Sequence, residues 1–263
     1  KCKFNSCSVK SQIGHGGAIL SLNCAIICHN SDFSNCSSKT NGGGGGIYIS
    51  IREKVDEEII IEKCSFDYCS ASFGGAVCLF SNVETNRITI NSCFFQRNSL
   101  LDSSRESSFV GGSCLYILAY NVVSKRCRFV NNFGSSSVKI DNNFDDAASQ
   151  LENRIISKSN VLIKECEFKI DSSSLSSLSY IRGPKNAINI EVEKCTFTGE
   201  LIDNAHHIFV ESHFNKVEEP KLKIKSCMFS SDMKKAINLN FDDLSSSIVQ
   251  FDTKMQVFNY NGE

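Results

Sequence analysis

The chain has 263 residues, and 41% of them are hydrophobic, which is enough for one sizeable domain with a core. Its 28 basic and 29 acidic residues nearly balance, which argues against a dedicated nucleic-acid binder with a basic stripe. No stretch reaches the roughly 18 apolar residues of a membrane helix, so we expect no membrane insertion by this segment.

The motif Cys-x-Phe, here called the anchor, recurs along the whole chain. Seven copies begin at residues 2, 64, 93, 127, 166, 195 and 227. Two degenerate copies are Ser31-Asp32-Phe33 and Gln256-Val257-Phe258. Neighbouring copies start 29 to 39 residues apart. A repeat of this length indicates a stacked solenoid in which each repeat contacts its neighbours.

A short segment before each anchor alternates apolar and polar residues, as in 59–63 and 161–165. This period and the β-branched residues predict a strand. Side chains two residues apart share a face of a strand, so strict alternation alone would not bury both this segment and the anchor. A kink or bulge must therefore re-aim the chain near the anchor, at a position that the sequence does not reveal. Inside the anchor, Cys and Phe share a face, and we expect both in the interior.

A second strand follows a glycine pair in the first four repeats, after Gly17, Gly46, Gly75 and Gly112. Later copies at 137–140, 186–190 and 236–239 lose the glycines but keep the strand pattern. No segment has a convincing helical length, and the strands recur at intervals too long for hairpins. Equivalent strands must then stack in parallel at about 4.8 Å.

The fold predicted is therefore all-β, a parallel β-helix of about eight or nine coils over residues 1–263. One interior column should hold Phe4, Phe33, Phe66, Phe95, Phe129, Phe168, Phe197, Phe229 and Phe258. The chain starts inside an anchor, so we expect it to be part of a longer protein. Residues 134–160 and 171–185 interrupt the rhythm and are interpreted as projecting loops, with a shorter excursion at 100–109.

Two short signatures also alternate along the first half of the chain. The first is Gly16-Gly17-Ala18-Ile19, nearly repeated at 74–77, and the second is Phe-x-x-Asn at 95–98 and 129–132. In three further copies of the second signature Cys7, Cys36 and Cys69 replace the Asn. Over residues 1–133 this pattern resembles the polymorphic outer-membrane protein repeat of chlamydiae, to which some trichomonad surface proteins are similar. The resemblance implies a right-handed β-helix and surface adhesion, and the family has no shared catalytic residues to carry over.

The fourteen cysteines admit two interpretations. An even number in a secreted protein suggests disulfides. A column of reduced, inward thiols explains the repeated anchor position by packing alone. Zinc has less support, because His206-His207 has no cysteine cluster nearby.

Enzymatic chemistry has little support from the sequence. Polysaccharide-cleaving β-helices need acidic residues that converge on one face. Gly14-His15-Gly16 and Asp145-Asp146 match fragments of the polygalacturonase signatures, but their order is reversed and their partner motifs are absent. His15 is more simply a turn residue, and Asp145-Asp146 and Asp242-Asp243 are more simply exposed acids. The single glycosylation sequon at Asn35 carries little weight. We expect no catalytic, cofactor-binding or metal-binding residues.

Three functions remain open from the sequence. The first is a non-enzymatic surface or secreted protein, an adhesin or stalk that binds protein or glycan on a flank of the rod. The second is an intracellular structural component of a cytoskeletal or ciliary assembly, and the third is a polysaccharide lyase or glycosidase. We also expect neighbouring coils or chains at both ends, because exposed strand edges would otherwise template aggregation.

Overall fold

The computed structural model describes most of the chain. The described residues are 1–11, 14–39, 41–81, 83, 87–101, 111–141, 159–170, 174–182, 188–199, 201, 205–212, 221–230, 236–241, 249–251 and 256–257. Every named element in them is a strand.

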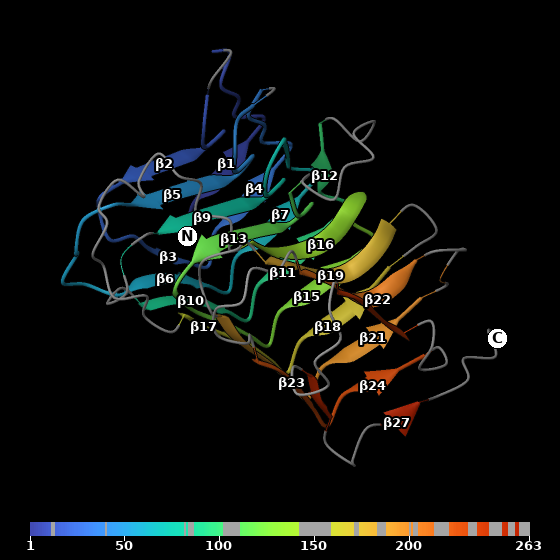
Figure 1. Ribbon diagram of the computed structural model, residues 1–263. Coiled ribbons are helices and arrows are strands. Elements are labelled where there is room, and N and C mark those ends of the chain that lie inside the picture. The colour runs from blue at the N-terminus through green and yellow to red at the C-terminus, as the bar shows by residue number, and fades with distance from the viewer. Residues whose placement is uncertain are drawn as a thin grey trace.

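Three parallel sheets run along the molecule, and equivalent strands of successive coils lie side by side (Figure 1). The first sheet contains the strands that begin inside the anchors: β1 (Lys3–Asn5), β4 (Asp32–Ser34), β7 (Ser65–Asp67), β11 (Phe94–Gln96), β15 (Arg128–Val130), β18 (Glu167–Lys169), β21 (Thr196–Thr198), β24 (Met228–Phe229) and β27 (Gln256–Val257). The second sheet contains β2 (Ile19–Leu22), β5 (Ile47–Ile51), β9 (Val77–Ser81), β13 (Leu115–Ala119), β16 (Gly134–Asp141), β19 (Ser174–Arg182), β22 (His206–Ser212) and β25 (Ile237–Phe241).

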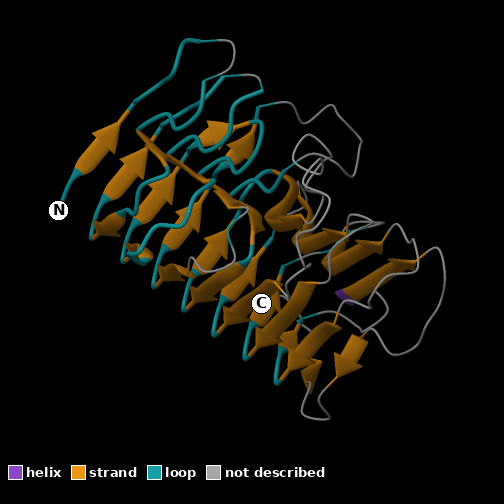
Figure 2. Ribbon diagram, turned by 60° about the vertical axis from the view of Figure 1, so that its left-hand side comes forward, coloured by secondary structure: helices purple, strands orange, loops and turns teal. Residues whose placement is uncertain are grey.

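The third sheet contains the strands that precede the anchors: β3 (Ile27–His29), β6 (Ile59–Glu62), β10 (Arg87–Asn91), β14 (Asn121–Lys125), β17 (Ser159–Lys164), β20 (Ile188–Glu193), β23 (Lys221–Lys225) and β26 (Val249–Phe251). A short pair, β8 (Ser70–Ala71) and β12 (Ser99–Leu100), completes the strands. The chain visits the three sheets in the same order in each coil, which confirms the predicted parallel β-helix (Figure 2).

About six turns of the solenoid are defined, somewhat fewer than the eight or nine predicted. The sheets themselves hold nine, eight and eight strands.

The anchor phenylalanines form the predicted interior column. Parallel pairing places each ring over its equivalent in the next coil, beginning with Phe4 over Phe33. Successive ring centroids from Phe4 to Phe229 lie 4.7–5.0 Å apart, and the rings are within 12° of parallel. All but the first ring are buried. Strand spacing therefore fixes the ring spacing, and the rings fill the centre of the described coils.

The last copy of the anchor departs from this prediction. The register pairs Phe229 with Val257, not with Phe258. The degenerate anchor at Gln256 is thus shifted by one position, and residue 258 lies outside the described residues.

The kink that the sequence requires is a single residue just before each anchor. Seven such residues have φ between 49° and 54°: Asn30, Lys63, Ser92, Arg126, Glu165, Lys194 and Ser226. This left-handed bend lets Ile61 and Cys64 both face inward although they are three residues apart. Such a backbone is uncommon for residues other than glycine and asparagine, and Lys, Arg and Glu give no sequence signal for it.

The anchor cysteines line the interior beside the bend. From Cys64 to Cys227, each thiol lies 3.3–3.4 Å from the carbonyl oxygen two residues earlier. It also lies 3.5–3.6 Å from a carbonyl oxygen of the preceding coil. A small polarizable group with a weak donor suits this space, which explains why the repeat keeps Cys here.

A second interior column begins with cysteine and continues with asparagine. Cys69 Sγ lies 3.7 Å from the Phe33 carbonyl oxygen, and Asn98 Nδ2 donates to the Phe66 carbonyl oxygen at 3.0 Å. Asn98 Oδ1 accepts from the Cys69 backbone N–H at 2.9 Å, and Asn132 Oδ1 accepts from Asn98 in the same way. Cys and Asn can replace one another at this position because both can donate to the phenylalanine carbonyl of the preceding coil.

The glycine pairs mark a close approach between coils. Gly44 has φ 66°, which glycine adopts without strain. A Cβ on Gly45 would overlap the carbonyl oxygens of Gly75 and Ser70. The stacked backbones therefore require glycine at this point.

Two of the predicted loops are partly strand. Residues 134–141 form β16, which confirms the strand predicted at 137–140. The 134–160 loop prediction was wrong at its start and at residues 159–160, which begin β17, and residues 142–158 lie outside the described residues. Residues 174–182 form β19, although they were predicted within the 171–185 loop. Most of the 100–109 excursion, from 102 onward, lies outside the described residues.

Residues 186–190 were also assigned to the wrong strand. Ile188 begins β20, which precedes the anchor and belongs to the third sheet. The second-sheet strand of this coil is β19, whose Ser176 and Ser177 are buried. Small serines can fill the interior as well as apolar residues can when they find hydrogen-bond partners, so the serine-rich composition misled the prediction.

Replacing Phe129 by Ala should lower the free energy of unfolding by about 3–5 kcal/mol, because it removes a buried ring from the middle of the stack. Urea unfolding followed by circular dichroism measures this. The matched control is Phe94→Ala, a half-buried neighbour on the outward side of β11, which should cost less than about 1.5 kcal/mol. Equal losses would contradict the interior stack.

Replacing Asn98 by Ala should cost about 2–3 kcal/mol, since the buried Cys69 N–H loses its acceptor. Asn98→Cys restores a donor to the Phe66 carbonyl and should recover about 1 kcal/mol of that loss. The same unfolding assay compares the two variants. If Asn98→Cys were the less stable variant, the equivalence of Cys and Asn in this column would be wrong.

Candidate interaction surface

The outward face of the third sheet presents side chains in register from coil to coil. Its strands bury Ile and Val side chains on one side, for example Ile88 and Ile90 of β10. The intervening residues face outward in register from coil to coil. Two adjacent columns of these outward residues are here called the central column and the bend column.

The central column holds four apolar residues and one threonine over five strands, and two charged residues over the next two. The aligned residues are Ile27, Ile60, Thr89, Val123, Leu162, Glu191 and Lys223. Ile27 is 60% exposed, and the other six are half-buried. A column of β-branched and leucine side chains on a flat sheet offers apolar area to a partner without a cavity.

The bend column carries polar and charged residues beside the central column. Its members are His29, Glu62, Asn91, Lys125, Lys164, Glu193 and Lys225. Each of them lies one residue before a left-handed bend, so each of these coils presents a polar group at the equivalent position of the sheet.

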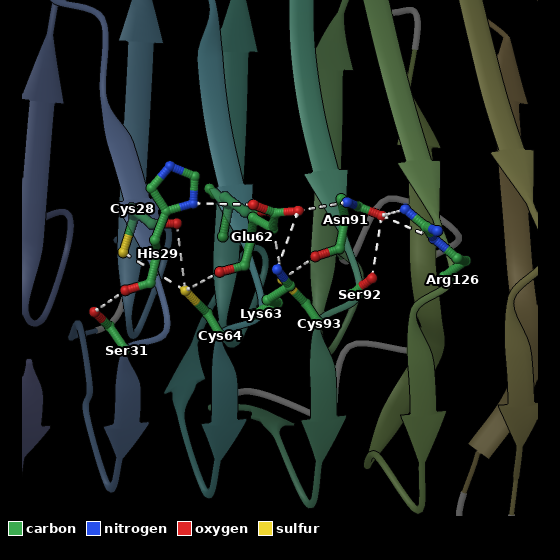
Figure 3. A network of polar contacts seen from close by, with 11 residues as sticks. Cys28, His29, Ser31, Glu62, Lys63, Cys64, Asn91, Ser92, Cys93 and Arg126 are labelled. Atoms are coloured by element: carbon green, nitrogen blue, oxygen red, sulfur yellow. Dashed lines mark hydrogen bonds and ion pairs between the residues drawn. The ribbon is translucent and has the colours of Figure 1, made fainter. Parts of the chain in front are cut away.

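Polar contacts connect this column from coil to coil (Figure 3). Glu62 Oε2 lies 3.2 Å from His29 Nδ1, and Glu62 Oε1 accepts from Asn91 Nδ2 at 2.8 Å. Arg126, the bend residue of the next coil, donates to Asn91 Oδ1 from Nε and Nη2 at 3.2 and 3.0 Å. The four side chains thus form one chain of contacts across four coils, which fixes their orientation.

The later coils replace this network by ion pairs. Lys164 Nζ lies 2.8 Å from Glu193 Oε2, and Lys225 Nζ lies 2.7 Å from Glu191 Oε1. The hydrogen bond from Lys164 lowers the pKa of Glu193, and Glu193 raises the pKa of Lys164. These pairs are partly exposed to solvent, so they contribute mainly to the pattern of the surface and modestly to stability.

His15 lies at a turn beside the second sheet. Its ring stacks on Tyr48 with centroids 4.2 Å apart, and its Nδ1 accepts from the Gly43 N–H at 3.0 Å. Partial burial lowers the pKa of His15. These contacts favour the turn-residue interpretation. Asp145, Asp146, Asp242 and Asp243 lie outside the described residues.

The two adjacent histidines of β22 point to opposite sides. His206 Nε2 lies 2.9 Å from Asn238 Nδ2. His207 is fully buried near Phe197 and Phe229, with Nδ1 3.2 Å from Ser177 Oγ, and its buried Nε2 has no hydrogen-bond partner. Burial, and then the nearby His206, lower the pKa of His207 to about 4. His207 is therefore a neutral core residue, which the sequence did not indicate.

The glycosylation sequon is split between two environments. Asn35 is exposed and has φ 52°, at the second left-handed bend of its coil. Cys36 is buried, with Sγ 3.5 Å from the Phe4 carbonyl oxygen. The Asn35 residue is exposed to solvent, whereas the next residue of the sequon, Cys36, is packed inside the coil.

Across the described part of the chain, no group of three or more His, Cys, Asp or Glu residues could hold a metal ion. The same residues include no helix long and apolar enough to cross a membrane. Searches against protein-family models, curated proteins and solved structures found no match for this chain.

The free energy of unfolding should fall as the pH decreases from 7 to 5. The folded protein holds the pKa of His207 at about 4, below the ordinary 6.5, so the unfolded chain binds the proton first. The stability contributed by neutral His207 is therefore complete above about pH 6.5 and is lost toward pH 4, by about 2 kcal/mol between pH 7 and 5.

Denaturant unfolding at several pH values measures this effect, and His207→Gln is the control because it keeps a polar side chain that does not titrate. His15 contributes in the same direction and is unchanged in both proteins. An identical pH dependence in the wild type and His207→Gln would show that His207 titrates normally.

Proposed function

We propose that this chain is a non-enzymatic β-helical rod of a surface or secreted protein, acting as an adhesin or stalk. The outward face of the third sheet would bind an extended protein or glycan partner. The observation that carries this proposal is the register of the central and bend columns over seven strands. Regular apolar and polar columns match a partner that also repeats or extends.

The resemblance to the chlamydial repeat supports surface adhesion as the context. It rests on the glycine-pair and Phe-x-x-Asn signatures of residues 1–133. The central column spans both this half and the later coils, so the proposed surface does not depend on where the resemblance ends.

The runner-up is an intracellular structural component, for example in a cytoskeletal or ciliary assembly. One observation favours it: all fourteen cysteines are free, and eleven of them are buried. Free thiols suit a reducing compartment. Protease treatment of intact cells separates the two, since a surface protein is digested and an intracellular one is protected.

We further propose that the chain has no hydrolytic or lyase activity. Polysaccharide cleavage is the third and least supported alternative. The reversed order of the polygalacturonase fragments and their missing partner motifs support the proposed absence of activity. Incubation with plant and bacterial polysaccharides tests this directly. Turnover that disappears in Asp145→Asn or Asp146→Asn would establish the enzyme instead.

The surface proposal predicts that Val123→Asp weakens partner binding about tenfold or more, because it places a charge in the apolar central column. Binding of the purified chain to a glycan array and to immobilised extracellular-matrix proteins measures this. Thr196→Asp is the matched control, since Thr196 is half-buried and outward on the first sheet. Binding lost in Thr196→Asp but kept in Val123→Asp would place the partner on the first sheet.

A further inference from the structure

Two thiols of neighbouring coils lie in contact near the first coil. Cys28 in β3 is 6% exposed, and Cys64, the residue directly before β7, is 2% exposed. Their sulfur atoms are 3.7 Å apart (Figure 3). A disulfide needs about 2.05 Å, so its formation requires the two sulfur atoms to approach by rotation of the side chains and movement of the backbone.

This pair exists because one coil departs from the anchor pattern. Ser31 occupies the anchor position of that coil, and the thiol stands three residues earlier, at Cys28. The same position, three residues before an anchor, holds Ile, Val or Ser in the other described coils: Ile61, Ile90, Ser124, Ile163, Val192 and Ile224. Ser124 makes the equivalent contact with Cys166, at 3.9 Å between Oγ and Sγ, but it cannot cross-link.

The strand that carries Cys28 is at an edge of the third sheet. β3 has three residues and pairs only with β6 among the described strands. Ile27 and His29 on either side of Cys28 are exposed. A strand of three residues with one paired neighbour in the 263-residue chain requires little free energy to open, and opening exposes Cys28 to reagents, although the thiol is buried in the closed state.

We propose that Cys28 and Cys64 are a redox pair that closes to a disulfide under oxidising conditions and locks the first coil onto the second. With a small-molecule disulfide as the oxidant, the Cys28 thiolate attacks one sulfur and expels a thiolate. The Cys64 thiolate then attacks Cys28 Sγ in the mixed disulfide and expels the second thiolate. Two protein thiols are oxidised, one disulfide is reduced to two thiols, and the two protons pass to the products.

The consequence is a first coil whose opening depends on the redox state. The bond would join residues 36 positions apart across the β3–β6 pair. In the reduced form β3 opens as an edge strand, whereas in the oxidised form it opens only together with β6. The inference concerns the contact between the coils of β3 and β6 and does not rest on the proposed partner of the third sheet.

The experiment equilibrates the 263-residue chain with oxidised or reduced glutathione. Free thiols are then alkylated in denaturant, and peptides are mapped by mass spectrometry without reduction. The oxidised sample should contain a Cys28–Cys64 peptide, and exchange of the β3 amide hydrogens should be about tenfold slower than in the reduced sample. Cys28→Ser should lose both effects, while Cys78→Ser should keep both, since Cys78 aligns with Tyr48 and Tyr116 and with no thiol.

The peptide map of the wild type does not depend on whether a variant folds. Alkylation of both Cys28 and Cys64 in the oxidised sample would overturn the proposal. A dominant link between Cys64 and Cys93, or equal β3 exchange in the two samples, would also contradict it.

Discussion

The structure depends on the vertical stacking of identical side chains at the spacing of paired parallel strands. Seven successive phenylalanine pairs keep centroid separations of 4.7–5.0 Å, which is close to the strand spacing itself. Backbone hydrogen bonds and ring contacts therefore favour the same register. A slip of one residue in any coil would turn a phenylalanine outward, so each ring also fixes the register of its neighbours.

The left-handed bends follow from this constraint. A coil must bury side chains from the third sheet and from the anchor, and only a bend between them allows both. Non-glycine residues such as Lys63 and Glu165 adopt φ near 50° there, at a cost in free energy that the packing of the stack must exceed. The same bends align polar side chains on the outer face, which connects the packing of the core to the proposed binding surface.

Much of the fold could be predicted from the sequence because the anchor repeats the same residue types, Cys and Phe, at similar intervals. Phe33 was placed correctly although its coil lacks the anchor cysteine. The bends were not located, because residue types such as Lys and Arg carry no signal for positive φ. The strand at Ser174–Arg182 was missed since buried serines look like a loop, and the shift at Val257 depends on pairing that no local pattern reveals.

The candidate surface was anticipated only as an unspecified flank. Alternation identified the outward residues of each strand, but their alignment into columns required the register between coils. The burial of His207 and the contact between Cys28 and Cys64 were not predicted for the same reason. Both depend on contacts between residues of neighbouring coils, about 30 to 36 positions apart in the sequence. Sequence reasoning is strongest within a repeat and weakest between repeats that differ in length.

The most direct test of this account is a crystal structure of the chain at a resolution that defines ring planes. We expect parallel strands in three sheets, with Phe33 to Phe229 buried and stacked at the 4.7–5.0 Å spacing. Antiparallel pairing of the anchor strands, or anchor phenylalanines that are mostly exposed, would contradict the central claim.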